Sequence, residues 1–257
     1  MRILFIRHGD PDYEHDTLTE TGKKEALLLA QAAPEMGLGH CFVSPLNRAQ
    51  ETASYTLKEL GCKAQTFDWL QEFPARVDVN ASKELQDAYP DTDRNNGKYC
   101  MRIAWDMLPS YWLSHPEYGD RDGWRESEVA RCSNLVQIYD SVTGSFDEFL
   151  ASYGYVREGG LYRVKKECTE SVTFFCHLGL TCALLSHLWN MSPFLLWHSL
   201  APAPTSVTEV VSEEREKGTA YFRALRIGDV SHLSGAGEKA SFSGRFCEVY
   251  GNKEQRH

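Results

Sequence analysis

The chain opens with a short apolar run that polar residues follow at once. Residues 3–6 are Ile-Leu-Phe-Ile, and Arg7, His8 and Gly9 come directly after them. An apolar run of this length without alternation is typical of a strand that is buried on both faces, as in the parallel sheets of α/β proteins. Ligands of such sheets gather at the carboxyl ends of the strands. We therefore expect a polar site directly after the first strand.

A repeat of strand and helix follows. A helix is predicted from about Thr19, because threonine can cap a helix and apolar residues at helical spacing continue until Pro34 and Gly37. Residues 40–44 are predicted to form a second buried strand, and residues 46–60 a second helix.

The second half of the chain resumes this pattern after an irregular stretch. Residues 126–150 predict a long helix with an interruption near Gly144. Residues 171–176 predict a third central strand, with a helix over 180–189. The segments 206–211 and 220–227 predict a hairpin around the polar residues 212–218.

These elements predict an α/β fold, a three-layer sandwich with a mostly parallel central sheet flanked by helices. The length of 257 residues and the hydrophobic content of 42% suit one domain over residues 1–257. Residues 73–123 lose the alternation and are rich in Tyr, Trp, Asp and Pro. We interpret them as a mainly helical insertion that covers the C-terminal ends of the strands.

Charge and cysteine usage exclude several classes of protein. The net charge of -9 argues against binding to nucleic acid or to an anionic membrane, which both need clustered basic surface. The 8 cysteines show neither a Cys-x-x-Cys pair nor zinc-ligand spacing, which indicates reduced thiols in a cytoplasmic protein. The first apolar run is too short for the core of a signal peptide, and later runs are interrupted by polar residues. The oligomeric state stays open.

Three predicted strands end in residues suited to one kind of chemistry. Arg7 and His8 follow the first strand, residues 44–48 with Arg48 follow the second, and His177 follows the third. A phosphoryl group carries close to two negative charges, so a site that transfers it needs cations and donors around its oxygens, and arginine supplies a planar fork. We expect His8 to be the nucleophile, neutral at the attacking nitrogen, while its other ring nitrogen donates to a backbone carbonyl.

The neighbours of His8 fit this hypothesis. Gly9 would let the backbone approach the phosphate closely, and His177 would donate to the same oxygens. The alternative for any single histidine at a strand end is a structural role.

The ordered set of motifs resembles the histidine phosphatase superfamily, the phosphoglycerate mutase-like group. The resemblance rests on Arg7-His8-Gly9, Leu18-Thr19-Glu20-Thr21-Gly22, the segment 44–53 (Ser-Pro-Leu-Asn-Arg-Ala-Gln-Glu-Thr-Ala), Gly123-Trp124-Arg125-Glu126-Ser127 and the strand ending at His177. It implies a phosphohistidine intermediate at His8, with Arg7, Arg48 and His177 as the phosphate pocket.

The resemblance also implies an acid residue that protonates the leaving oxygen, and Glu72 matches its place. Burial and the nearby phosphate would raise the pKa of this carboxyl and favour the proton donor form. The chain departs from the family pattern at Phe73-Pro74-Ala75-Arg76, where the family often has a stretch rich in Gly and Trp. It departs again at Leu178, where the family usually has glycine.

Other residues are weaker candidates for the site. Gly9, Asp10, Glu126 and Ser127 are predicted at the rim of the pocket, although Asp10 fits a solvated loop equally well. Three tryptophans in and just after the insertion would form either a lid over an organic substrate or the small core of the insertion; they are Trp105, Trp112 and Trp124.

The favoured function is a metal-independent phosphatase without a cofactor that hydrolyses a small phosphorylated substrate. A phosphoglycerate mutase would use the same pocket but return the phosphoryl group to a second oxygen of the product. A third possibility from another class is a non-catalytic phosphate-binding or interaction module that has kept the fold. The sequence does not identify the substrate.

Overall fold

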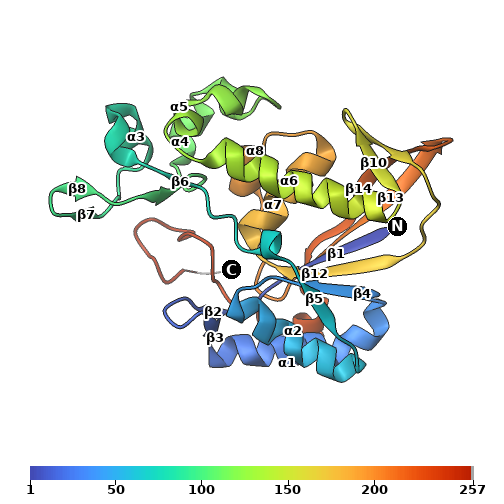
Figure 1. The fold of residues 1–257 in the computed structure, drawn as a ribbon. Coiled ribbons are helices and arrows are strands. Elements are labelled where there is room, and N and C mark those ends of the chain that lie inside the picture. Colours follow the sequence, from blue (N-terminus) through green and yellow to red (C-terminus); the bar gives the residue numbers. More distant parts are fainter. Residues whose placement is uncertain (256–257) are drawn as a thin grey trace.

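The computed structural model describes residues 1–255 and is built around one eight-stranded sheet (Figure 1). In spatial order the strands are β10 (Tyr155–Glu158), β11 (Leu161–Val164), β14 (Thr219–Asp229), β13 (Val207–Glu216), β1 (Arg2–Arg7), β12 (Ser171–Cys176), β4 (His40–Val43) and β5 (Ala64–Thr66). The predicted strands 3–6, 40–44 and 171–176 are therefore confirmed, and the structure places them side by side in the sheet.

The sheet is mixed, so the prediction of a mostly parallel sheet is wrong. β1, β12, β4 and β5 run parallel to one another, whereas β10, β11, β14 and β13 pair antiparallel, and β13 is also antiparallel to β1. Short turns join β10 to β11 and β13 to β14, and a short turn can only connect antiparallel strands. The parallel half needs crossover connections, which the helices provide.

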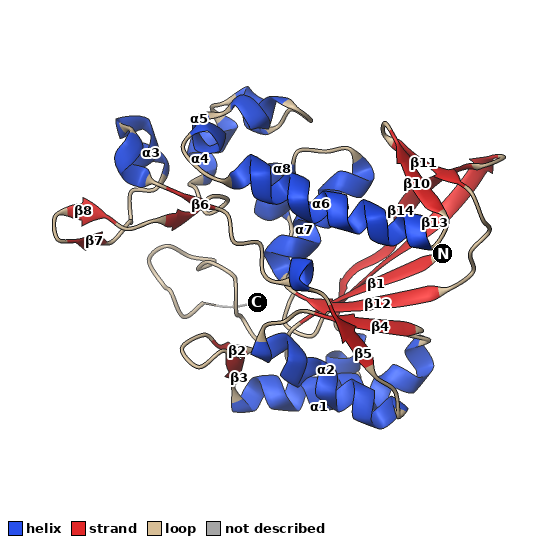
Figure 2. Ribbon diagram, in the orientation of Figure 1, coloured by secondary structure: helices blue, strands red, loops and turns tan. Residues whose placement is uncertain are grey.

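Helices cover both faces of the sheet and make three layers (Figure 2). One layer contains α1 (Glu20–Met36), α2 (Asn47–Leu60) and α9 (Ser231–Ser234). The other contains α6 (Leu135–Ser152), α7 (Leu178–Trp189) and α8 (Pro193–Ser199). The predicted three-layer α/β architecture is confirmed.

The first strand shows why its sequence is apolar without alternation. Ile3 and Phe5 belong to the larger core cluster, whereas Leu4 and Ile6 belong to the smaller one, which includes Leu29 of α1. Since successive side chains of a strand point to opposite faces, a strand between two helical layers needs apolar residues at every position. All four of these strand residues are fully buried or nearly so.

The first helix begins where predicted, and of the two predicted stop signals only Gly37 ends it. The Thr19 hydroxyl accepts a hydrogen bond from the amide of Gly22, which is the expected N-cap. Pro34 lies inside the last turn rather than ending the helix. The helix continues to Met36 and stops at Gly37, whose φ of 60° is the left-handed conformation common after a helix.

The insertion lies beyond the carboxyl ends of the parallel strands, where Figure 1 places α3 and β6 to β8. It combines short helices with two short strand pairs and long loops. Its elements are β6 (Arg76–Val77), α3 (Lys83–Ala88), β7 (Arg94–Asn95), β8 (Lys98–Tyr99), β9 (Arg102–Ile103) and α4 (Pro109–Leu113). Another short pair, β2 (Pro11–Asp12) and β3 (Thr17–Leu18), follows β1.

The long helix predicted over 126–150 is divided at a different place. α5 (Glu128–Arg131) and α6 are separated at residues 132–134, and α6 runs through Gly144 without a break. The break has a tertiary cause, because the Cys132 carbonyl accepts from the amide of Asp78 and Ser133 forms a bridge with Val77. Backbone groups that pair with β6 cannot also continue a helix.

The predicted hairpin is confirmed, but its strands are longer than expected. β13 continues through the polar residues 212–216, and the turn is at residues 217–218. These positions are polar because the end of the hairpin is more exposed than the rest of the sheet. Polar side chains suit such exposed strand positions as well as they suit loops.

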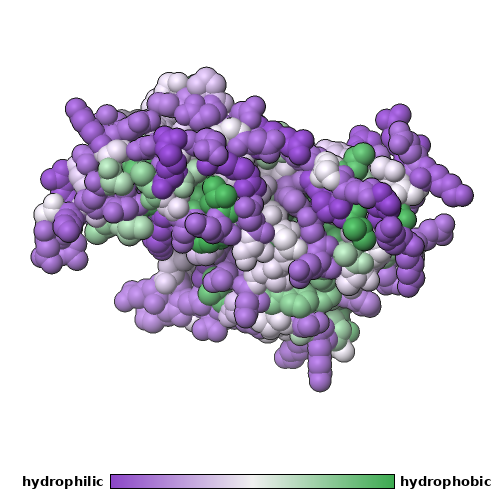
Figure 3. All heavy atoms as spheres, turned by 45° about the horizontal axis from the view of Figure 1, so that its top comes forward, coloured by the Kyte–Doolittle hydropathy of each residue, from purple (hydrophilic) through white to green (hydrophobic). Residues whose placement is uncertain are grey.

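The surface is dominated by polar residues on the face that Figure 3 shows, where hydrophobic residues form small separate areas. Within residues 1–255, no helix combines the length and apolar character that a membrane crossing requires.

The centre of the larger core is an aromatic cluster around Phe174 of β12. Its fully buried ring packs against Phe5, Phe42 and Phe149 at centroid distances of 5.0 to 5.6 Å. We predict that Phe174→Ala lowers the free energy of unfolding by about 3–5 kcal/mol, because it leaves a cavity that rigid rings cannot fill. The denaturation midpoint in guanidinium chloride measures this loss. Leu225→Ala is the control, since this side chain is 63% exposed and should change the midpoint little; equal shifts would contradict the prediction.

Candidate active site

The three predicted strand ends meet at one edge of the sheet. Parallel pairing sets Arg7 opposite Cys176 and Phe175 opposite Val43. The amide of His8 donates to the Cys176 carbonyl over 3.0 Å, which continues this register by one residue. The rings of His8 and His177 then lie 5.1 Å apart between centroids.

The ring of His8 is held in one tautomer. Its Nδ1 lies 2.7 Å from the carbonyl oxygen of Gly9. Because a carbonyl can only accept, Nδ1 carries the proton and Nε2 keeps its lone pair. Burial, with a smaller effect of the Arg7 charge, lowers the pKa of His8 to about 3. His8 is therefore neutral at neutral pH and has its Nε2 lone pair available as a nucleophile.

His177 is equally buried and is fixed by two elements. It occupies the N-cap position of α7, and its Nε2 lies 2.7 Å from the hydroxyl of Ser44, at the end of β4. Burial lowers the pKa of His177 well below its ordinary value, and the neighbouring His8 and arginines lower it further. Both histidines therefore act as neutral groups, and the positive charge of the site comes from arginine.

Two buried arginines supply that charge. Arg7 is 5% exposed and Arg48 is 8% exposed. Arg7 Nη1 donates to the carbonyls of Pro202 and Ser243, over 2.8 and 3.0 Å, and Arg48 forms an ion pair with Asp16. Within the described part of the chain, the Nε atoms of both arginines are buried without a hydrogen-bond partner. An anion with several oxygens suits such donors.

Glu72 lies against the first turn of α7, the helix that His177 precedes. Its Oε1 accepts from the amides of Phe73 and Leu180, over 2.8 and 3.1 Å. Burial raises the pKa of this carboxyl even though these amides and Arg7 act in the opposite direction. Since Oε1 accepts both hydrogen bonds from the backbone amides, a proton on the Glu72 carboxyl would be carried by Oε2.

Gly9 serves the packing of the loop after β1 against the first turn of α1. A Cβ on Gly9 would lie 2.7 Å from the carbonyl oxygen of Gly22, and a Cβ on Gly22 would lie 2.2 Å from that of Asp10. These two glycines let the loop after β1 lie directly on the first turn of α1. The amide of Gly9 donates to the Thr52 hydroxyl, which in turn donates to the Arg48 carbonyl.

The other residues predicted at the rim make contacts elsewhere. The Asp10 carboxylate accepts from the hydroxyl of Thr19, at the start of α1. The Ser127 hydroxyl caps α5 by accepting from the amide of Ala130. The Glu126 carbonyl accepts from Arg131. A role at the rim for Asp10, Glu126 and Ser127 stays a prediction.

Two acidic residues of the site were not predicted. Asp16 pairs with Arg48 and accepts from the amide of Asn47 over 2.8 Å. Glu25 is 3% exposed and accepts from the amides of Asp10 and Ser241. A signal for Glu25 exists in the sequence, because it lies at helical spacing between the buried Gly22 and Leu29.

The three tryptophans divide between the site and the core. Trp105 packs against Gly179, where an added Cβ would lie 2.7 Å from its indole and 2.9 Å from Glu72. Trp112 contacts His198 at a ring distance of 5.2 Å. Trp124 is 1% exposed and packs on Tyr139, so it belongs to the core.

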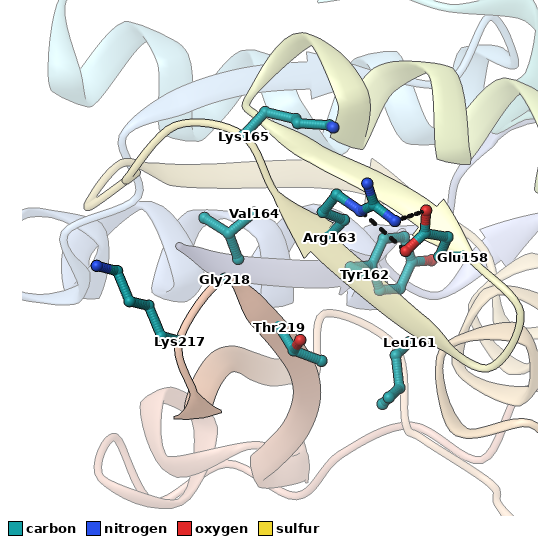
Figure 4. Close-up of a pocket in the computed structure, with 9 residues that line it drawn as sticks. All are labelled: Glu158, Leu161, Tyr162, Arg163, Val164, Lys165, Lys217, Gly218 and Thr219. Atoms are coloured by element: carbon teal, nitrogen blue, oxygen red, sulfur yellow. Dashed lines mark hydrogen bonds and ion pairs between the residues drawn. The ribbon is translucent and has the colours of Figure 1, made fainter.

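A separate cavity of about 570 Å³ lies at the opposite end of the sheet (Figure 4). Antiparallel pairing sets Val207 opposite Ile6 and Val211 opposite Arg2, so the turn at residues 217–218 extends beyond the amino end of β1. Lys217 lines this cavity, and Arg163 pairs with Glu158 beside it. The cavity therefore takes no part in the site around His8.

The described residues contain no group of three or more His, Cys, Asp or Glu side chains placed to hold a metal ion. The same residues contain eight free cysteines and no disulfide.

Comparisons with known proteins agree with this geometry. Residues 3–100 match the family model described as the histidine phosphatase superfamily, branch 1. A curated relative, a probable phosphoglycerate mutase of Cronobacter sakazakii, is 30% identical over 71 residues, which is 24% of this chain and 33% of the relative. The match thus spans about a third of the length of that relative.

Solved structures share the fold over most of the chain. A mycobacterial glucosyl-3-phosphoglycerate phosphatase in complex with VO3 aligns with a TM-score of 0.55 at 17% identity, covering 88% of this chain and 98% of that one. A phosphoserine phosphatase mutant of Entamoeba histolytica, in complex with phosphoserine, aligns with a TM-score of 0.56 at 13% identity, covering 90% and 98%.

The family match includes Arg7, His8 and Arg48, and the fold brings them together with His177, which lies outside the matched residues. Residues 3–100 of the chain are thus similar to the histidine phosphatase superfamily, branch 1.

Proposed function

We propose that the protein is a phosphatase that hydrolyses a small phosphomonoester through a phosphohistidine at His8, without a metal ion or cofactor. The observation that carries this proposal is the state of His8, a buried neutral imidazole whose Nδ1 proton is held by the Gly9 carbonyl. An imidazole in this state is a nucleophile without further activation. The buried guanidinium groups of Arg7 and Arg48 match the charge of a phosphate dianion.

In the first step, Nε2 of His8 attacks the phosphorus atom in line with the leaving oxygen. The N–P bond forms as the P–O bond to the organic group breaks, and the Glu72 carboxyl gives its proton to the leaving oxygen. Arg7 and Arg48 stabilise the charge on the three equatorial oxygens, and His177 donates a hydrogen bond to one of them.

In the second step, water attacks the phosphorus atom and the N–P bond breaks. Glu72, now a carboxylate, takes a proton from the water, and inorganic phosphate leaves. His8 returns to its neutral form with Nδ1 still protonated. The raised pKa of Glu72 suits this exchange of roles, because a carboxyl that titrates closer to neutrality serves as both acid and base.

Small phosphorylated metabolites are the proposed substrates. The structural relatives named above include phosphatases of glucosyl-3-phosphoglycerate and phosphoserine, which are phosphomonoesters of small acids. Residues 73–123 lie over the carboxyl ends of the strands and would select the organic group. Trp105 would line this part of the pocket, since it packs beside Glu72.

His8→Ala is expected to reduce hydrolysis of p-nitrophenyl phosphate to the background rate, because no other group replaces the nucleophile. Release of p-nitrophenolate measures this loss. His40→Ala is the matched control, since His40 is exposed at the start of β4, at the other end of the sheet. Full activity of His8→Ala would refute the proposal, as would equal losses in the two variants.

Glu72→Gln is expected to slow hydrolysis of an alkyl phosphate by about 10²–10⁴-fold, the usual contribution of a general acid. The loss should be smaller for p-nitrophenyl phosphate, whose leaving group needs no proton. The ratio of kcat/KM between wild type and variant, measured for each substrate, gives the two losses. Glu59→Gln is the control, because Glu59 is exposed on the surface of α2. A loss that is the same for both substrates would argue against the proton donor role.

The pH dependence follows from the same assignment. The raised pKa keeps the Glu72 carboxyl protonated to higher pH. We therefore expect kcat/KM to be highest below this pKa and to fall as the pH rises through it, because the proton donor is lost. The Glu72→Gln variant should lack this descending limb. A limb that persists unchanged in the variant would assign it to another group.

A phosphoglycerate mutase is the second candidate, and the relative from Cronobacter sakazakii favours it. The two activities differ in whether water or a second hydroxyl accepts the phosphoryl group. With 3-phosphoglycerate as substrate, we predict that inorganic phosphate appears and that 2-phosphoglycerate does not. Enolase-coupled detection separates the products, and predominant formation of 2-phosphoglycerate would favour the mutase.

A further inference from the structure

The last part of the chain returns to the candidate active site. After α9, residues 235–255 form an irregular segment of turns and loops with an isolated bridge between Val249 and Asn252. Figure 1 shows this segment beyond the carboxyl ends of the central strands, between the insertion and the layer of α1 and α2. It is more than two hundred residues from Arg7 in sequence, yet it contacts Arg7 directly.

Three contacts attach this segment to the site. Glu238 forms an ion pair with Lys24 of α1. The amide of Ser241 donates to Glu25 Oε1 over 3.0 Å. The carbonyl of Ser243 accepts from Arg7 Nη1 over 3.0 Å.

Glu25 joins this segment to the loop that follows the nucleophile. Its Oε2 accepts from the amide of Asp10 over 2.9 Å, while its Oε1 accepts from Ser241. The side chain is 3% exposed, and burial raises its pKa. A buried carboxyl with a backbone amide on each oxygen therefore holds both segments in one arrangement.

Gly244 makes the closest approach to Arg7. Its φ is +79°, in the left-handed region, and a Cβ added there would lie 2.8 Å from Arg7 Nη2 and 3.3 Å from Nη1. The other side chains therefore do not fit at this position while the guanidinium stays where it is. Glycine here allows the backbone to lie against the face of the arginine.

We propose that residues 238–244 form a positioning element of the phosphate pocket that fixes the guanidinium of Arg7. The carbonyls of Pro202 and Ser243 both accept from Nη1, which sets the plane of the fork, and Gly244 packs against it. Nε is then held without a protein partner and can face an oxygen of the phosphate. This inference rests on the proposed function, since it assigns Arg7 to phosphate.

The physical reason is preorganisation. Arginine has a long flexible side chain, and holding it in the productive geometry before phosphate binds removes an entropy cost from binding. A displacement of about 1 Å in such a group can cost up to about 10²-fold in rate. The sequence contains no local motif for this role, because the segment acts through its backbone.

Gly244→Ala tests the inference against Gly237→Ala. Both glycines lie in the same segment with nearly equal φ, +79° and +74°, but an added Cβ at Gly237 meets no atom within 4 Å. Backbone strain is therefore common to both variants, and only Gly244→Ala displaces Arg7. We expect Gly244→Ala to weaken binding of inorganic phosphate and of vanadate by about tenfold or more relative to Gly237→Ala, with similar thermal midpoints.

The measurements are the inhibition constants of phosphate and vanadate, and calorimetric titration with inorganic phosphate. Equal affinities in the two variants would overturn the inference. If Gly244→Ala does not fold, Glu25→Gln replaces it. The glutamine side chain has only one oxygen, so its NH₂ group would face one of the two backbone N–H groups and could not accept a hydrogen bond from it. Weaker phosphate binding is again expected, and unchanged binding would overturn the inference.

Failure of this inference is distinct from failure of the proposed function. If the wild-type protein hydrolyses p-nitrophenyl phosphate and the two glycine variants bind phosphate equally, only the role of residues 238–244 is wrong. If the wild-type protein hydrolyses no phosphomonoester but Gly244→Ala still weakens phosphate binding, the positioning role stands and the catalytic proposal is wrong.

Discussion

Burial of the carboxyl edge of the central strands is the constraint on which the site depends. His8, His177 and Arg7 are each at most 5% exposed, and this burial decides their charge. Desolvation disfavours the charged form of an imidazole and of a carboxylate alike. It therefore keeps the lone pair on His8 and favours the proton on Glu72, which are the states that the proposed first step needs. Arginine keeps its charge under the same conditions, so the positive charge of the site is confined to the guanidinium groups that would bind phosphate.

The surrounding structure supports this edge with backbone contacts. Gly9 and Gly22 let the loop after β1 pack directly on α1, and Glu25 connects the loop after the nucleophile with the last segment of the chain. The Ser243 carbonyl then orients Arg7. A site assembled from three strand ends, one helix and a distant segment can hold its groups within the narrow tolerance that phosphoryl transfer requires.

The sequence predicted the centre of the fold better than its margins. Residues 3–6 had to be a buried strand because they are apolar at every position, and the order of the motifs indicated the family. The predicted hairpin was too short because residues 212–216 look like a loop, and the strands β10 and β11 were not predicted. The break before α6 depends on a tertiary pairing with β6 that no local pattern records. Arg7, His8, Arg48 and His177 could be proposed from three strand ends. Asp16 and residues 238–244 could not, because their contacts join segments that are distant in sequence.

The central claim is that the phosphoryl group is transferred twice, first to His8 and then to water. The stereochemistry at phosphorus tests this claim most directly. A chiral phosphorothioate monoester labelled with ¹⁸O, hydrolysed in ¹⁷O-enriched water, gives a chiral inorganic thiophosphate. Two successive in-line displacements predict net retention of configuration. Net inversion would mean that water attacks the substrate directly and would contradict the phosphohistidine intermediate.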